Sequence, residues 1–162
     1  LGAALSEDHW GILRDDQGEN ISNKNRLYCE LSAHFWAWKN LTGADYIGLA
    51  HYRRYLDVSN ERKVEQLLNK HDIILPIPLT LPHTNMFNLQ EVLTREDVYI
   101  MMTCLKKLYP DYIVSANKYL MLSNKNIRCN MFITSKKIFD DYSQWLFEIL
   151  FETEKYDIMT KR

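Results

Sequence analysis

The residues best suited to chemistry lie in the segment Gly48–Tyr55, which reads GLAHYRRY and follows a short apolar run. Arginine can bind phosphate oxygens through two parallel hydrogen bonds, and a tyrosine ring can stack on a base or on a sugar face. The segment predicts a site for a ligand with phosphates and a flat ring. His51, Arg53 and Arg54 are the candidate catalytic residues, and Tyr52 is a candidate binding residue. The alternative is a solvated strand end, because short basic clusters are common on protein surfaces.

A pair of carboxylates, Asp15 and Asp16, lies in a polar stretch that has the composition of a loop. Carboxylates can hold a divalent metal such as Mn or Mg against a diphosphate. The same stretch is also typical of a turn or a helix-capping loop.

Four further polar residues are candidates by position, and a fifth, His34, is not. Asn23 and Asn25 open a predicted helix, whose free N–H groups can receive an anion, although plain capping explains them equally well. Glu30 lies in an otherwise apolar helical stretch and is either a buried ligand or base or a solvent-facing side chain. Asn130 heads a buried strand and either reaches a substrate or satisfies nearby backbone. His34 is interpreted as a structural histidine.

The elements that must position these residues follow from the hydrophobic pattern. Apolar runs without alternation predict buried strands at 46–50, 72–76 and 129–133. Helical spacing predicts helices at about 22–42, 62–69, 94–108 and 111–122, a last one after Ser135, and a long loop over 77–93. This alternation predicts an α/β domain with a largely parallel central sheet flanked by helices, which binds ligands at the carboxyl ends of its strands.

Composition sets the class of protein. The 162 residues suit a single domain over 1–162, with 46% hydrophobic and 25% charged residues. A net charge of −1 provides no global field for nucleic acid, and no apolar run approaches the length of a membrane span. The three cysteines are interpreted as buried free thiols of a reducing compartment. The chain begins with Leu1 rather than Met, so we expect a fragment of a longer cytoplasmic protein.

The common phosphate and hydrolase motifs are absent from the sequence. It contains no GxGxxG, P-loop, HExxH or GxSxG, and no Asp-x-Asp. The missing glycine-rich phosphate loop counts against a nucleotidyltransferase.

Several motifs in a fixed order carry a family resemblance: DDQGENIS, YCEL and FWAWKN, then ADYIGLAHYRRY, DIILP, NMFI and DYSQWLFEILFE. Together they resemble a family of unknown-function domains in bacterial capsular and exopolysaccharide biosynthesis proteins. That family looks like glycosyltransferases of the nucleotide-diphospho-sugar type. The resemblance implies their Rossmann-like fold, known as GT-A, with a first strand that would precede Leu1.

The resemblance also implies roles for individual positions. Such enzymes end one strand in Asp-x-Asp, which holds a metal against the donor diphosphate, whereas here the strand ends in His51-Tyr52-Arg53. Either the arginines neutralise the diphosphate directly, or His51 rebuilds a metal site with one of the two aspartates at 15 and 16. In this family context Asn23, Asn25, Tyr28 and Glu30 would lie near the nucleotide, and Asn130 near the sugar or the acceptor.

The sequence and the resemblance together predict a glycosyltransferase that moves a hexose from a nucleoside diphosphate sugar to a saccharide or lipid-linked acceptor, at the inner face of the membrane. Candidate bases for the acceptor hydroxyl are His51, Glu30, Asp15 and Asp16. The alternative is a non-catalytic sugar- or nucleotide-binding module of polysaccharide assembly, which the missing Asp-x-Asp supports.

Overall fold

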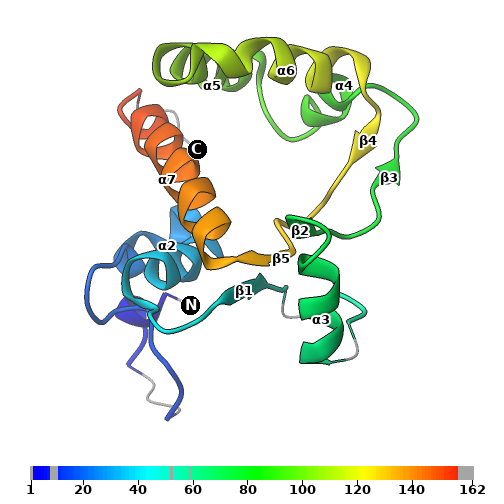
Figure 1. The fold of residues 1–162 in the computed structure, drawn as a ribbon. Helices are drawn as coiled ribbons and strands as arrows, with labels where there is room; N and C mark the ends of the chain where they lie inside the picture. The colour runs from blue at the N-terminus through cyan, green and yellow to red at the C-terminus, as the bar shows by residue number, and fades with distance from the viewer. Residues whose placement is uncertain (1, 8–10, 52, 59, 157–162) are drawn as a thin grey trace.

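The fold was analysed in a computed structural model, which describes residues 2–7, 11–51, 53–58 and 60–156 (Figure 1). The strands are β1 (Tyr46–Leu49), β2 (Ile73–Ile74), β3 (Leu79–Thr80), β4 (Lys125–Asn126) and β5 (Phe132–Ser135). The helical elements are η1 (Ala3–Leu5), η2 (Ser22–Lys24), α1 (Asn25–Tyr28), α2 (Leu31–Asn40), α3 (Glu61–Leu68), α4 (Asn85–Leu89), α5 (Arg95–Leu108), η3 (Pro110–Tyr112), α6 (Ile113–Asn117), the π-helical turn η4 (Lys118–Leu122) and α7 (Lys136–Glu154).

The central sheet differs from the predicted parallel arrangement. Among the described residues it has three strands in the order β1-β5-β2, and both pairings are antiparallel. β1 and β2 therefore run in the same direction with α3 between them in sequence, as in a βαβ unit. The later strand β5 lies between them and runs the opposite way. The hydrophobic pattern predicted a strand near β5, but the alternation of strands and helices carried no information about the direction in which that strand pairs.

Two predicted elements are interrupted where the backbone leaves the regular regions. The helix expected over 22–42 consists of η2, α1 and α2, and the break between α1 and α2 lies at Cys29, which adopts φ 47°. The strand expected from position 129 begins at Phe132, because Cys129 and Asn130 have φ 73° and 42°. Positive φ is uncommon for residues with a Cβ and ends regular structure locally.

The core lies between α2, α7 and the sheet. One cluster joins Phe35 of α2 to Phe147 of α7, and a second joins Phe139 of α7 to residues of β1 and β5. Trp38 stacks on Phe147 with ring centroids 5.8 Å apart. Ser135 caps the start of α7 by accepting a hydrogen bond from the backbone of Ile138, which sets the point where β5 becomes α7.

A second layer lies across the far end of α7, where α5 and α6 run over it and β3 and β4 lead back toward the sheet (Figure 1). The predicted start of α5 is confirmed, since Thr94 and Asp97 form a reciprocal capping box. The stretch predicted as a loop over 77–93 contains β3 and α4. Asn85, buried at the start of α4, donates to the carbonyl oxygens of Tyr119 and Lys125 and so ties α4 to η4 and β4.

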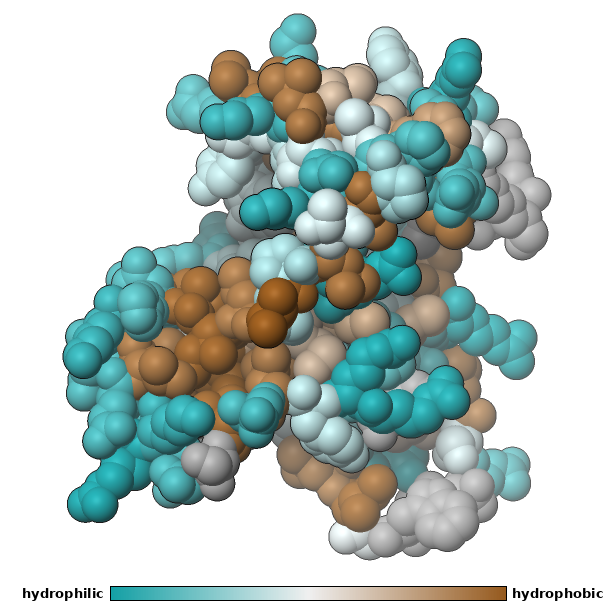
Figure 2. Space-filling model, turned by 90° about the vertical axis from the view of Figure 1, so that its right-hand side faces the viewer, coloured by the Kyte–Doolittle hydropathy of each residue, from teal (hydrophilic) through white to brown (hydrophobic). Residues whose placement is uncertain are grey.

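One face of the molecule is apolar over a wide area. Figure 2 shows brown side chains gathered on the lower part of this face, with hydrophilic side chains at its border. Exposed apolar areas of this kind occur where a protein contacts another segment or a ligand. Within the described ranges, no helix is both long and apolar enough to span a bilayer.

Candidate functional site

A cavity of about 370 Å³ opens where β1 ends and β5 begins, and its volume falls within the range of small-molecule sites. Its lining combines apolar side chains with a few converging polar groups, as ligand sites do. The lining residues are Leu13, Arg14, Asp15, Glu30, Ala33, His34, Trp36, Ala37, Leu41, Leu49, Ala50, His51, Cys129 and Asn130.

The antiparallel pairing explains how His51 and Asn130 come to border one cavity. Leu49 pairs with Phe132, so the same register continued by two residues would bring His51 opposite Asn130. In a parallel sheet the end of one strand and the start of the next lie at opposite edges. The antiparallel β5 is therefore what joins these two sequence-predicted residues.

One face of α2 forms a wall of the cavity. Three residues of the helix, Ala33, His34 and Ala37, lie along this face at helical spacing, and the flanking residues Glu30 and Leu41 continue it at either end. The two alanines keep the wall thin and leave room for a ligand.

Asp15 borders the cavity, but its carboxylate oxygens already accept hydrogen bonds from other parts of the chain. Its carboxylate accepts hydrogen bonds at 2.8–2.9 Å from the backbone N–H groups of Gly2 and Ala3 and from the hydroxyls of Ser22 and Ser32. Burial by itself would raise the pKa of Asp15, but these four donors outweigh it and lower the pKa to about 2. The carboxylate is therefore ionised at neutral pH, is a weak base, and ties the start of the chain to η2 and α2.

Asp16 is held by its neighbour. The Arg14 guanidinium donates to both Asp16 oxygens, at 2.6 Å for the closest pair, and also to the carbonyl oxygen of Ala3. This charge-assisted bonding lowers the pKa of Asp16. Arg14 lines the cavity, and its positive charge is paired with the carboxylate of Asp16.

The predicted carboxylate metal site does not fit this arrangement. Four donors use the oxygens of Asp15, and Arg14 uses those of Asp16. Within the described part of the chain, no three His, Cys, Asp or Glu side chains come together as metal ligands.

A directed hydrogen-bond network lies behind the cavity. Ser143 donates to the carbonyl oxygen of Phe139 at 2.6 Å, so its oxygen accepts from His34 Nε2 at 2.8 Å. His34 Nδ1 is then the unprotonated nitrogen, and it faces Asn130 Nδ2 at 3.5 Å. Asn130 Oδ1 accepts from the hydroxyl of Tyr142 at 2.9 Å. Burial lowers the pKa of His34 to about 4, so the ring is neutral at pH 7.

The turn that carries Asn130 is conformationally strained. Cys129 and Asn130 are consecutive residues with positive φ, and both border the cavity. Such conformations each cost on the order of 1–3 kcal/mol and persist where the surrounding structure enforces them, often at functional sites.

The arginines of the GLAHYRRY segment lie beside the cavity rather than in its lining. Arg53 lies in a turn, where the Arg54 N–H donates to the His51 carbonyl oxygen at 3.0 Å. Arg53 and Arg54 are exposed on this turn. Tyr52, predicted as a binding residue, lies outside the described residues.

Three other predicted residues lie away from the cavity lining. Asn23 is exposed, and Asn25 donates to the Cys29 carbonyl oxygen and to Ser32. Tyr28 is buried and donates to Glu154 at 2.9 Å, which joins α1 to the end of α7. Burial and this carboxylate raise the pKa of Tyr28 above its usual value.

The structure thus brings together Asp15, Glu30, His51 and Asn130 and adds Arg14 and His34 to them. The sequence carried a signal for the helix wall, since two alanines stand in an otherwise bulky stripe of α2. It carried none for Arg14, whose place depends on the packing of the first loop.

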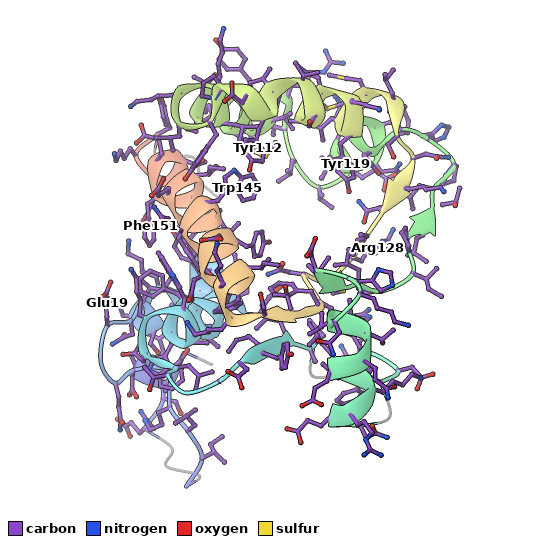
Figure 3. The ribbon with its side chains drawn as sticks, viewed as in Figure 1. Glu19, Tyr112, Tyr119, Arg128, Trp145 and Phe151 are labelled. Atoms are coloured by element: carbon purple, nitrogen blue, oxygen red, sulfur yellow. The ribbon has the colours of Figure 1, made fainter. Side chains whose placement is uncertain are left out.

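A second cavity, of about 700 Å³, lies between α7 and the layer of α5, η3, α6 and η4. Its lining is almost wholly apolar and includes Met101, Leu105 and Ile149. The rings of Tyr112 and Trp145 meet beneath α5 and α6 with centroids 5.8 Å apart (Figure 3). Because few polar groups converge there, the first cavity is the better candidate for chemistry.

Comparison with known proteins agrees with the fold and the motifs. The chain is similar to a solved structure of WbbM, a bifunctional glycosyltransferase in its apo form, with a TM-score of 0.85 and 32% identity. The match covers 96% of this chain and 33% of that one, so this chain spans about a third of its length. Curated proteins give no match. The family model described as "Domain of unknown function (DUF4422)" matches residues 1–162, and the chain belongs to that family.

Proposed function

We propose that this domain is part of a glycosyltransferase that moves a hexose from a nucleoside diphosphate sugar to a capsular or exopolysaccharide acceptor at the cytoplasmic side of the membrane. The observation that carries the proposal is the cavity with its few converging polar groups near Arg53 and Arg54, in a chain that is 32% identical to a glycosyltransferase over nearly its whole length. A family likeness alone would support the fold, whereas the converging polar groups support a ligand site.

The proposed reaction assigns charge stabilisation to the arginines. The acceptor hydroxyl oxygen bonds to the anomeric carbon of the hexose as the bond from that carbon to the diphosphate breaks. The diphosphate leaves with the bonding electrons, and Arg53 and Arg54 stabilise the negative charge that develops on it. Both residues are exposed and follow His51, which lines the cavity, so a diphosphate has access to them.

The proton of the acceptor hydroxyl goes to a base, and the geometry narrows the choice. Asp15, with a pKa of about 2, is a weak proton acceptor, and Asp16 is bound by Arg14. The other two candidates, His51 and Glu30, also border the cavity. We therefore propose one of these two as the base.

The test is turnover of a nucleotide-sugar panel by the full-length protein and by an Arg53→Ala, Arg54→Ala double variant. Loss of charge stabilisation should reduce turnover by about 100-fold or more. Arg62→Ala, an exposed arginine on α3, is the matched control and should keep full activity. Full activity of the double variant would refute the assignment of the arginines.

Metal dependence is tested in the same assay with manganese and with EDTA. Because the oxygens of Asp15 and Asp16 are used within the fold, we propose that the arginines neutralise the diphosphate directly. Turnover should then persist in EDTA, and a strict need for manganese would contradict this.

A non-catalytic binding module is the second candidate. The engagement of the paired carboxylates within the fold favours it, since glycosyltransferases of this type often use such carboxylates for the donor metal. Tight binding of a nucleotide sugar, with no transfer or hydrolysis under any metal condition, would establish the module and exclude the enzyme.

A further inference from the structure

The side-chain amide of Asn130 is held from two sides, and one of its hydrogens is left without an acceptor among the described residues. Tyr142 of α7 donates to Oδ1, and His34 of α2 faces Nδ2 through its unprotonated nitrogen. An amide nitrogen carries two hydrogens, and the network uses one. Since Asn130 borders the cavity, the second hydrogen is available to an oxygen of a bound molecule.

The orientation of this amide follows from a chain of donors that begins at a backbone carbonyl. The Phe139 carbonyl oxygen can only accept, so Ser143 donates to it and accepts from His34. This leaves Nδ1 of His34 as an acceptor, which attracts the amide nitrogen of Asn130 and repels its oxygen. Tyr142 favours the same orientation from the other side, because its hydroxyl donates to the amide oxygen.

The charges around the cavity indicate which part of a ligand can lie there. Asp15 is buried and ionised, and Glu30 adds a second carboxylate to the lining. Arg14 is the one cation among the lining residues, and Asp16 already matches its charge. His34 is buried and neutral. A diphosphate placed among these groups would meet uncompensated negative charge, whereas a neutral polyol would meet donors and acceptors.

We propose that this cavity binds the neutral hexosyl group of the donor, that Asn130 donates a hydrogen bond to one of its hydroxyls, and that His34 is the positioning residue that orients the Asn130 amide. The diphosphate then lies outside the cavity, toward Arg53 and Arg54. The inference rests on the proposed function for the identity of the donor. It adds that the hexosyl group lies in the cavity while the diphosphate lies near Arg53 and Arg54.

The strained turn supports the assignment. Asn130 reaches the cavity because it and Cys129 hold positive φ, and the contacts from α2 and α7 keep them there. Strained backbone conformations of this kind are often retained at functional sites, and here the strained turn places the amide beside the cavity.

The first test compares the affinity of the full-length protein for UDP-glucose, UDP-galactose and GDP-mannose with its affinity for free UDP and GDP. Asn130→Ala should weaken binding of the preferred nucleotide sugar about three- to tenfold and leave binding of the free nucleotide unchanged. Tyr142→Phe should weaken it in the same direction by a smaller factor. Tyr109→Phe is the control, because its hydroxyl contacts Glu148 away from the cavity.

An equal loss of affinity for free nucleotide and nucleotide sugar in Asn130→Ala would overturn the proposal, because Asn130 would then contact the diphosphate. No change in either affinity would overturn it as well.

The second test separates positioning by His34 from a merely structural role. His34→Asn keeps an acceptor near the place of Nδ1, whereas His34→Gln places its amide near the place of Nε2 and leaves Nδ2 of Asn130 without its acceptor. Both variants lose the aromatic packing of the ring against Phe139 and should lose thermal stability alike. His34→Asn should retain sugar affinity within about threefold and His34→Gln should not. Equal affinities in the two folded variants would refute the positioning role.

A third measurement keeps this inference distinct from the proposed function. If no nucleotide sugar binds, the proposed donor is wrong, and methyl hexosides at millimolar concentration then test the cavity by ligand-observed NMR. Binding of a neutral hexoside that Asn130→Ala abolishes would uphold the sugar site without the transferase. Absence of hexoside binding as well would end both proposals.

Discussion

Asp15 accepts hydrogen bonds from four donors that belong to three separate parts of the chain. Gly2 contributes one of them, and it does so at φ 64° in contact with Asn25, where a Cβ atom would lie 2.6 Å from that side chain. A carboxylate at the edge of a cavity thus serves the fold, and its chemistry is that of a fixed negative charge.

Replacing Asp15 by Asn should lower the free energy of unfolding by about 2–3 kcal/mol, because it removes the negative charge and leaves the side chain only one acceptor oxygen for the backbone N–H groups of Gly2 and Ala3, which can only donate. Asp16→Asn is the matched control at the neighbouring half-buried position, where Arg14 supplies the side-chain contact, and it should have a much smaller effect. Urea denaturation at pH 7 measures both. Equal stability of the two variants would show that Asp15 does not hold the start of the chain against η2 and α2.

The buried histidine makes stability depend on pH. The unfolded chain binds a proton at His34 near pH 6.5, whereas the folded chain binds it near pH 4. Between these values the unfolded state holds more protons, so stability rises with pH in this window and is lost on acidification. We expect a loss of about 3 kcal/mol between pH 6.5 and 4, and no such loss in His34→Asn.

Ionisation of Asp15 also makes the stability of the fold rise with pH, but in a lower pH range than His34 does. Its pKa is about 2 in the folded chain against 3.8 in the unfolded one. The stability that it contributes is present above pH 4 and declines as the pH falls from about 4 to 2. Denaturation curves of Asp15→Asn should show this decline removed, while the decline between pH 6.5 and 4 persists.

The elements that carry the site meet through β5. This strand pairs with β1 on one side and β2 on the other, and it leads directly into α7, which supplies Ser143 and Tyr142. Thr134 of β5 is buried and donates to the carbonyl oxygen of Asp72 at 2.6 Å, which ties the strand to the segment before β2.

Thr134→Val keeps the shape of the side chain and leaves the Asp72 carbonyl oxygen without that partner. The free energy of unfolding should fall by about 1–2 kcal/mol. Thr80→Val, at an exposed position of β3, is the control and should change stability by less than about 0.5 kcal/mol. A Thr134→Val variant as stable as the native chain would show that this hydrogen bond does not hold the strand in place.

Across the whole molecule, three free thiols lie at three depths. Cys29 is exposed, Cys129 is half-buried in the cavity lining, and Cys104 is fully buried in α5. This corrects the expectation that all three are buried, because the backbone turns outward at Cys29 where the predicted long helix is interrupted.

Thiol labelling of the folded protein should therefore show one fast cysteine, one slow cysteine and one that reacts only on unfolding. A bound nucleotide sugar should slow the alkylation of Cys129 and leave that of Cys29 unchanged, as mass spectrometry of labelled peptides would show. Protection of Cys29 alone would place the ligand elsewhere.

Local sequence was sufficient for much of this fold. The strand at Tyr46–Leu49, the capping box at Thr94 and the long helix after Ser135 were all predicted from residue patterns and are confirmed. These features depend on neighbours within a few positions, through side-chain periodicity and capping hydrogen bonds. The same logic located His51 and Asn130 at strand ends.

The tertiary structure decided the direction of the sheet and the membership of the site. Whether β5 pairs parallel or antiparallel depends on contacts across more than eighty positions, which no local pattern encodes. That pairing brings Asn130 to His51, and packing in the first loop turns Asp15 from a candidate ligand into a buried hub. The sequence thus determined which side chains were available for chemistry. Only the fold determined which of them share a cavity, because burial and hydrogen bonds assign each carboxylate and amide its partners.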